Sequence, residues 1–202
     1  MDKKKLLVLI DSVEFAKTSL QHAKQKALQG NKHIDIVAFS FEETGNILFS
    51  LSPEQLLSLQ DKCLSSLRAQ LEPLISAELE GCSYTFQTAW HEAPEQWLNE
   101  DINTDDYEMV IKTRHIDSDS QFSELDWQLI RFTPIALYLA ADNKWRKHTN
   151  ILAALDLASE KTAKHKLNQS IIKYGLAYAQ RTDCEFYAGY TVYISPILRD
   201  LG

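Results

Sequence analysis

The chain contains one short apolar motif twice, and this repetition limits how the chain can fold. Residues 5–11, Lys-Leu-Leu-Val-Leu-Ile-Asp, return as residues 150–156, Asn-Ile-Leu-Ala-Ala-Leu-Asp, about one domain length later. In both places an apolar strand ends in an aspartate, a helical segment follows, and a second β-rich run comes next, at residues 34–41 and 184–192. The repetition predicts one complete α/β domain followed by an incomplete second copy.

Between the repeats, β-rich runs alternate with segments whose apolar residues recur at helical spacing. The predicted strands cover residues 6–10, 34–41, 84–89, 107–111 and 135–140. Helices are predicted after the first strand, after Pro53, after Pro94 and over residues 122–131. Right-handed crossovers would wind these elements into a doubly wound parallel sheet with helices on both faces.

The helices of the two copies carry matching apolar stripes. The first stripe comprises Ala16, Leu20, Ala23 and Ala27, and the second comprises Leu167, Ile171, Tyr174 and Tyr178. Gly30 is expected to be the C-cap of the first of these helices. The long helix between them should begin with Ser52 as N-cap and Pro53 as its first residue. Pro73 is expected to kink this helix or to end it near Leu71.

A polar segment separates the two predicted copies. We expect a domain at residues 1–142, a linker at residues 143–149 and the N-terminal part of a second domain at residues 150–202. The linker contains Trp145, which favours a fixed contact between the copies over a loose tether. The first strand of the incomplete copy lacks a neighbour on one side, and such an edge favours pairing with another chain. A homodimer, or a complex with another protein, is therefore predicted.

Composition excludes several classes of protein. Among the 202 residues the formal net charge is −7 and no block of Lys and Arg offsets it, which argues against nucleic acid and anionic membranes as partners. The apolar run after Lys5 has only five residues, too short for a signal peptide or a membrane span. Three widely spaced cysteines suggest neither disulfides nor a metal site, and the six histidines show no ligand spacing. We expect a reduced, cytoplasmic protein without a bound metal.

Several segments, in order along nearly the whole chain, resemble the universal stress protein family, in particular its tandem E-type members. They are residues 7–11 (Leu-Val-Leu-Ile-Asp), 51–54 (Leu-Ser-Pro-Glu), 90–94 (Trp-His-Glu-Ala-Pro), 126–131 (Asp-Trp-Gln-Leu-Ile-Arg), 155–160 (Leu-Asp-Leu-Ala-Ser-Glu) and 188–190 (Ala-Gly-Tyr). The resemblance implies a five-stranded sheet of order 3-2-1-4-5, with paired halves in tandem members. It also implies a non-enzymatic role in the cytoplasmic stress response, through protein–protein contacts.

Family members that bind ATP use an aspartate after the first strand and a loop of pattern G-x2-G-x9-G-[S/T] after the fourth. Glycines let backbone N–H groups approach the phosphates closely. Residues 112–127 of this chain contain no glycine, and Asp126-Trp127 replaces the final Gly-Ser or Gly-Thr. A carboxylate at that helix start repels a phosphate. The first domain is therefore predicted not to bind ATP, and the alternative is a nucleotide-binding stress module whose competent site lies in a missing C-terminal half.

Four residues are candidate ligand contacts, each with a simpler interpretation beside it. Asp11 and Asp156 end the first strand of each copy, so they either contact a ribose or adenine, or act as helix N-caps or turn residues. Lys112 and Arg114 either hold an anion by their side chains, or belong to a solvated loop at residues 112–115 that balances Asp117 and Asp119. Without the glycine loop, the simpler interpretation is favoured for both pairs.

No catalytic group is predicted. His91 and Glu92 have no nearby nucleophile, and a hydrolase using Asp11 would lack both a nucleophile and an oxyanion donor. The chain is therefore not expected to be an enzyme. Trp127 and Trp145 are equally well interpreted as interface anchors or as core residues.

Overall fold

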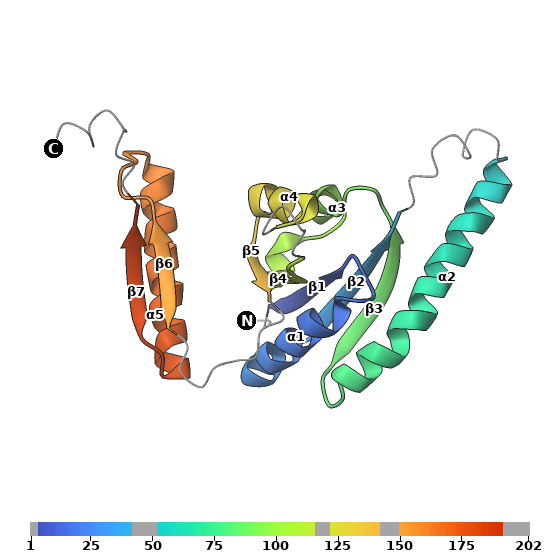
Figure 1. Cartoon of the computed structure of the whole chain (residues 1–202), viewed down its shortest axis with the longest axis horizontal. Coiled ribbons are helices and arrows are strands. Elements are labelled where there is room, and N and C mark those ends of the chain that lie inside the picture. The colour runs from blue at the N-terminus through green and yellow to red at the C-terminus, as the bar shows by residue number, and fades with distance from the viewer. Residues whose placement is uncertain (1–3, 42–51, 116–121, 142–149, 192–202) are drawn as a thin grey trace, which may run out of the picture. The chain divides into compact units, whose positions relative to one another are not determined.

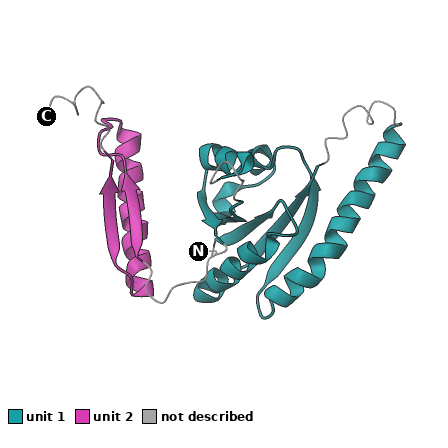
Figure 2. Ribbon diagram, viewed as in Figure 1, with its two compact units in different colours: residues 1–142 teal, residues 143–202 magenta. Residues whose placement is uncertain are grey.

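The computed structural model describes residues 4–41, 52–115, 122–141 and 150–191. The chain divides into two compact units, residues 1–142 and 143–202 (Figure 2). The predicted linker, with Trp145, lies outside the described residues.

The first unit is built on a five-stranded, all-parallel sheet of order β3-β2-β1-β4-β5 (Figure 1), which confirms the predicted sheet. Its strands are β1 (Lys5–Ile10), β2 (Ile34–Ser40), β3 (Tyr84–Trp90), β4 (Tyr107–Thr113) and β5 (Ala136–Ala140). Its α-helices are α1 (Ala16–Gly30), α2 (Pro53–Glu78), α3 (Pro94–Glu100) and α4 (Glu124–Phe132), and a 3₁₀ turn, η2 (Thr104–Asp106), precedes β4. Strand β4 extends two residues beyond its predicted end, which places Lys112 inside the sheet.

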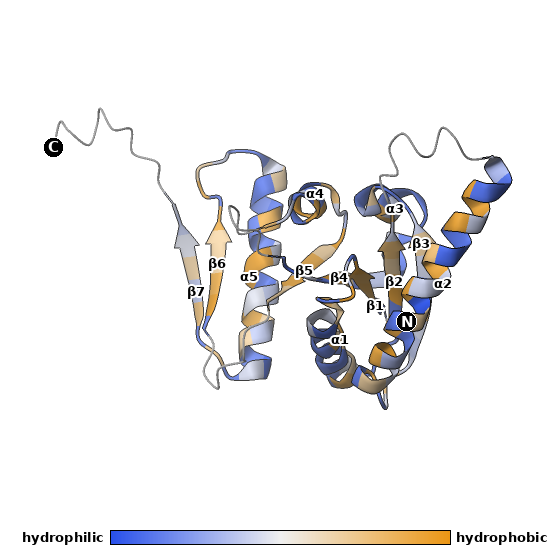
Figure 3. Cartoon of the chain, turned by 45° about the vertical axis from the view of Figure 1, so that its right-hand side comes forward, coloured by the Kyte–Doolittle hydropathy of each residue, from blue (hydrophilic) through white to orange (hydrophobic). Residues whose placement is uncertain are grey.

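Helices cover both faces of this sheet, as predicted. On one face, alternate residues of β1 and β2 pack against α1 and α2. On the other face, the intervening residues, including Leu7 and Leu9, pack with Leu98 of α3 and Leu129 of α4. Central strand β1 is therefore buried on both sides, and Figure 3 shows β1 and β2 in the colours of apolar residues.

Helix α1 follows its predicted stripe, because Ala16, Leu20, Ala23 and Ala27 are all buried. Its end differs by one residue from the prediction. The helix includes Gly30, and Asn31 is the C-cap, with a left-handed φ of 47° and its N–H donated to the Ala27 carbonyl. Asparagine tolerates this conformation better than most residues with a side chain, so the glycine is not required there.

Helix α2 begins as predicted but does not end as predicted. Ser52 is its N-cap and forms a reciprocal capping box with Gln55. The expected end near Leu71 is wrong, because the helix continues through Pro73 to Glu78. Pro73 lies on the exposed side, while Leu71 and Ile75 on the inner side are buried against the sheet. This burial stabilises the helix on both sides of Pro73 despite the hydrogen bond that proline removes.

The second unit contains a β-α-β arrangement of β6 (Ile151–Leu155), α5 (Thr162–Thr182) and β7 (Phe186–Tyr190), in which β6 and β7 are parallel. The predicted stripe on α5 is correct only in part, because Ile171 and Tyr178 are partly buried. Leu167 and Tyr174 are exposed, whereas Asn168 and Ala179 are buried and Gly175 lies against the Phe186 ring. A Cβ added at Gly175 would lie 2.3 Å from that ring, so small residues on this side let the helix approach β7 closely.

Candidate functional site

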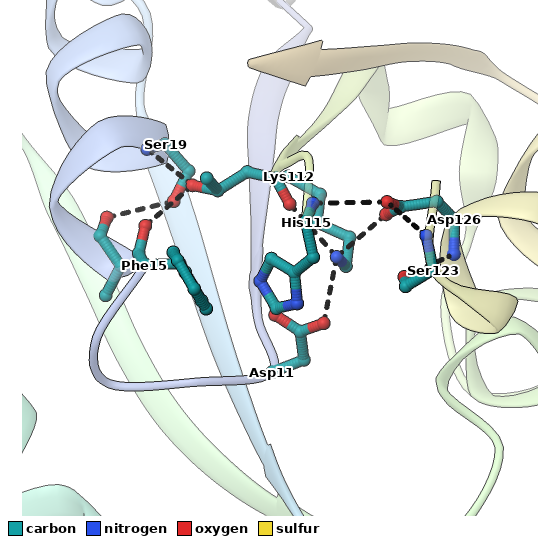
Figure 4. A network of polar contacts seen from close by, with 9 residues as sticks. Asp11, Phe15, Ser19, Lys112, His115, Ser123 and Asp126 are labelled. Atoms are coloured by element: carbon teal, nitrogen blue, oxygen red, sulfur yellow. Dashed lines mark hydrogen bonds and ion pairs between the residues drawn. The ribbon is translucent and has the colours of Figure 1, made fainter. Parts of the chain in front are cut away.

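The carboxyl ends of β1 and β4 meet where the strand order changes direction, the usual position of ligand sites in such sheets. Asp11 follows β1, Lys112 is the penultimate residue of β4, and His115 lies two residues beyond that strand. Asp126 belongs to the first turn of α4. Figure 4 shows these four side chains converging, and we call them the Lys112 cluster.

Lys112 is fully buried, and its ammonium contacts two carboxylates. Nζ lies 2.8 Å from Asp126 Oδ1 and 2.8 Å from Asp11 Oδ2. Its third contact is a hydrogen bond of 3.0 Å to the carbonyl oxygen of Thr113. An ammonium has three N–H donors; Lys112 donates hydrogen bonds to Asp126 and Thr113, and Asp11 is its second ion-pair partner inside the protein.

Asp126 is as deeply buried as Lys112, and it also ties α4 to the end of β4. Its Oδ2 accepts hydrogen bonds from the backbone N–H groups of His115 (3.3 Å) and Ser123 (3.2 Å). Its own N–H donates to Ser123 Oγ at 3.2 Å, which completes a capping box. The predicted carboxylate at this helix start is therefore confirmed, and the structure shows that Lys112 is its partner.

Asp11 is the more exposed carboxylate of the cluster, with 20% of its side chain accessible. Its Oδ1 lies 3.2 Å from His115 Nε2, an electrostatic contact whose orientation falls short of a hydrogen bond. The Phe15 ring packs on His115 with ring centroids 4.3 Å apart. Burial raises the pKa of Asp11, but His115 and Lys112 outweigh it and hold that pKa below the ordinary 3.8.

Thr113 connects the end of β4 to the start of α1. Its hydroxyl donates to the Phe15 carbonyl at 2.7 Å and accepts from the Ser19 N–H at 3.0 Å. Phe15 is the N-cap of α1 and supplies no side-chain hydrogen bond of its own. Of the two simpler interpretations of Asp11, the helix N-cap is therefore wrong, whereas Asp11 does lie at a bend before α1, with its carboxylate against Lys112.

The favoured interpretation of residues 112–115 as a solvated loop is also wrong. Lys112 and Thr113 are buried residues of β4, and Arg114 and His115 are partly buried. The two aspartates that this loop was expected to balance, Asp117 and Asp119, lie outside the described residues.

Of the four predicted contacts, the structure brings Asp11 and Lys112 together. Arg114 is held apart from them: its N–H donates to the Ala140 carbonyl at 2.7 Å, and its guanidinium carbon lies 5.7 Å from the Phe122 ring centroid. Asp156 belongs to the second unit. Its backbone is bracketed by two hydrogen bonds with the Asn168 side chain, and its exposed carboxylate lies 3.5 Å from Lys164 Nζ.

The chemistry of the Lys112 cluster is electrostatic. Its members offer no serine or cysteine nucleophile, and the described residues include no group of three His, Cys, Asp or Glu side chains arranged to hold a metal. No helix in the described ranges is long and apolar enough to cross a membrane. Trp127 is 41% exposed, so its interpretation as a core residue is wrong, and its role as an interface anchor stays a prediction.

Comparison with known proteins identifies relatives in sequence and in fold, although no family model matches. Universal stress protein E of Photorhabdus laumondii is 24% identical over 172 residues, which are 83% of this chain and 55% of that protein. Universal stress protein E of Salmonella typhi is 25% identical over 154 residues, or 74% of this chain and 48% of that protein. The chain thus spans about half the length of these curated relatives.

Solved structures share the fold. A putative universal stress protein from Pseudomonas aeruginosa UCBPP-PA14 aligns with a TM-score of 0.59 and 17% identity, over 99% of this chain and 65% of that one. Protein PA1789 from Pseudomonas aeruginosa PAO1, of unknown function, aligns with a TM-score of 0.57 and 17% identity, over 93% and 60% respectively. The sequence relatives support the universal stress protein family, and the solved structures show the fold.

Proposed function

We propose that this chain is a non-enzymatic universal stress protein that acts in the cytoplasmic stress response through protein–protein contacts. We further propose that its first unit does not bind ATP at the carboxyl ends of the strands. The sequence relatives support the stress-response role. The Lys112 cluster is the single observation that carries the second proposal, because side chains of the protein itself hold the place where a ligand would be recognised.

The charges of the cluster oppose a phosphate. Lys112 contributes one positive charge and the carboxylates of Asp11 and Asp126 contribute two negative charges, so the group is already anionic when His115 is neutral. A phosphate would add negative charge beside a fully buried carboxylate at the start of α4. To be neutralised it would need Lys112, whose release would leave Asp126 without its cation.

The backbone at the start of α4 is also committed. The Asp126 N–H donates to Ser123 Oγ, and the Trp127 N–H donates to the Ser123 carbonyl. Free N–H groups at a helix N-terminus are what bind phosphate in nucleotide sites. Here the capping box satisfies part of them, and the glycine-free sequence around it limits close approach to the rest.

Calorimetric titration of the full chain with Mg-ATP tests this proposal. We expect no saturable heat at millimolar ATP. Binding with a micromolar Kd would contradict the proposal, and repeating the titration with Asp11→Asn would then locate the nucleotide. Loss of binding in that variant would place it at the strand ends, whereas retained binding would place it elsewhere in the chain.

The protein-contact part of the proposal is supported by exposed apolar side chains in the second unit. Leu152, Tyr187 and Tyr190 are 74%, 50% and 42% exposed. Leu152 and Tyr187 are register partners of β6 and β7, so they lie on one face of this sheet, next to Gly189, whereas Tyr190 lies on the other face. Apolar clusters of this kind usually mark contact surfaces.

We propose that this face pairs with a second copy of the chain. Light scattering should give a mass of about twice 23.1 kDa, and Leu152→Glu should reduce it to the monomer mass. Leu28→Glu is the matched control, since Leu28 is a 62% exposed leucine on α1 in the first unit. A monomer mass for the unaltered chain at high concentration would contradict the homodimer and leave a different protein as the partner.

A further inference from the structure

A cavity of about 460 Å³ lies in the first unit beside the edge strand β5. It is separate from the Lys112 cluster, none of whose members lines it. Helix α4, strand β5 and the segment between them supply most of its walls, through Leu129, Ile130, Thr133, Ile135, Leu137 and Leu139. Arg114 and Phe122 complete the lining. Its volume lies within the range typical of small-molecule sites.

Two polar atoms in this apolar lining are buried without a hydrogen-bond partner: Nε of Arg114 and Oγ1 of Thr133. Buried polar groups in proteins are almost always hydrogen-bonded, so an unsatisfied pair lining one cavity calls for a partner. The guanidinium stays charged at all physiological pH values, which makes the missing partner of Arg114 an acceptor, preferably an anionic one.

The nearby carboxylates do not provide that acceptor. Asp11 and Asp126 are engaged by Lys112, and the described residues form no ion pair with Arg114. The Arg114 backbone is fixed by its hydrogen bond to the Ala140 carbonyl, and Thr133 is fixed by its N–H bond of 3.0 Å to the Leu129 carbonyl. The backbones of both residues are therefore anchored beside the cavity.

We propose that this cavity binds a small organic monoanion, a monocarboxylate with an aliphatic or aromatic body. The carboxylate accepts from Arg114, Thr133 supplies a second polar contact, and the body packs against the leucines and isoleucines of α4 and β5. The single cation and the apolar lining favour one charge over the several charges of a nucleotide or polyphosphate. This site does not depend on the proposed function and goes beyond it.

Calorimetry on the full chain, with octanoate as the probe and octanamide as its neutral counterpart, tests the proposal. We expect saturable binding of octanoate and at least tenfold weaker binding of octanamide. Arg114→Met should weaken the binding of octanoate at least tenfold and leave the affinity for octanamide unchanged. Arg68→Met is the matched control, because Arg68 also lies over a phenylalanine ring, Phe86 in β3, but outside this cavity.

Methyl NMR shifts of Leu137 and Leu139 on adding octanoate place the ligand, and they should be absent in a folded Arg114→Met chain. Three results would overturn the proposal: no octanoate binding at millimolar concentration, equal affinity for octanamide, or octanoate binding that Arg114→Met does not change. If octanoate binding disappears as the chain self-associates, a second copy of the chain occupies the cavity, and this result would also overturn the proposal.

Discussion

Replacing Lys112 by methionine should destabilise the first unit strongly, because it removes the cation from a buried carboxylate. Asp126 is completely inaccessible and would lose its 2.8 Å contact with Lys112 Nζ. It would keep its two backbone N–H donors, from His115 and Ser123. Asp11, being 20% exposed, can regain water. Breaking a buried ion pair from one side typically costs about 3–5 kcal/mol, and we expect Lys112→Met to fall in that range.

The double variant Lys112→Met/Asp126→Asn separates the lost pair from lost packing. Asparagine is neutral and keeps an acceptor for the capping box, so the double variant should be at least about 1 kcal/mol more stable than Lys112→Met alone. Lys17→Met is the control, since Lys17 lies 3.4 Å from Glu78 on the surface with 61% of its side chain exposed. That substitution should cost about 0–1 kcal/mol.

Urea unfolding followed by tryptophan fluorescence measures these differences, because Trp90, Trp97 and Trp127 all belong to the first unit. A loss below about 1 kcal/mol for Lys112→Met, equal to that of Lys17→Met, would refute the reasoning. It would mean that Asp126 is not left as an unpaired charge away from water. A double variant no more stable than the single one would show that the cost is packing and not an unpaired charge.

Four further predictions concern other parts of the chain. Because the pKa of Asp11 is lowered, its contribution to stability is present above its ordinary pKa of 3.8 and is lost as pH falls through the folded value. In urea unfolding, the difference in free energy of unfolding between the unaltered chain and Asp11→Asn should therefore narrow below about pH 4. Burial lowers the pKa of His22, so the unfolded chain takes up more protons than the folded chain below pH 6.5. The melting temperature should therefore fall from pH 6.5 toward pH 5, and it should fall less in His22→Gln. Pro73→Ala should raise stability by about 1–3 kcal/mol in urea, because it restores a helical N–H at an exposed position inside α2, and an unchanged midpoint would show that the helix is distorted there. Gly175→Ala should lower the hydrogen-exchange protection of α5 and β7 by about 1 kcal/mol, since the added methyl meets the Phe186 ring, and equal protection would mean that the ring moves aside without cost.

The elements and their order could be predicted from the sequence because apolar periodicity records burial directly. An uninterrupted apolar run such as residues 6–10 fits a strand buried on both faces, and the Ser-Pro pair at residues 52–53 marks a helix start. The errors in α2 and α5 have local causes. Periodicity does not show that burial of Leu71 and Ile75 outweighs the hydrogen bond lost at Pro73. Gly175 has no side chain, so the apolar pattern of α5 gives no sign of its close approach to β7.

The Lys112 cluster could not be predicted, because it depends on the register between strands. Lys112 of β4 pairs with Leu9 of β1, and Asp11 lies two residues after Leu9, on the same face of the chain as it leaves the sheet. Helix α4 covers that face and brings Asp126. A lysine and two aspartates scattered over more than a hundred residues carry no pairing signal in the sequence. The charged residues at 112–115 therefore suggested a solvated loop, whereas the strand register places Lys112 in a buried ion pair.

The absence of glycine around α4, the carboxylate of Asp126 and the buried Lys112 form one consistent arrangement. Without glycine around α4, backbone N–H groups cannot approach an anion closely, and the first turn of the helix needs another acceptor. Asp126 supplies that acceptor, but a buried carboxylate requires a cation, and Lys112 supplies it. The buried carboxylate at the start of α4 and its buried cation thus depend on each other. Restoring a glycine alone would leave the Asp126–Lys112 pair in place, so we expect that single change to create no affinity for ATP in calorimetry, whereas recovery of binding by it would contradict this dependence.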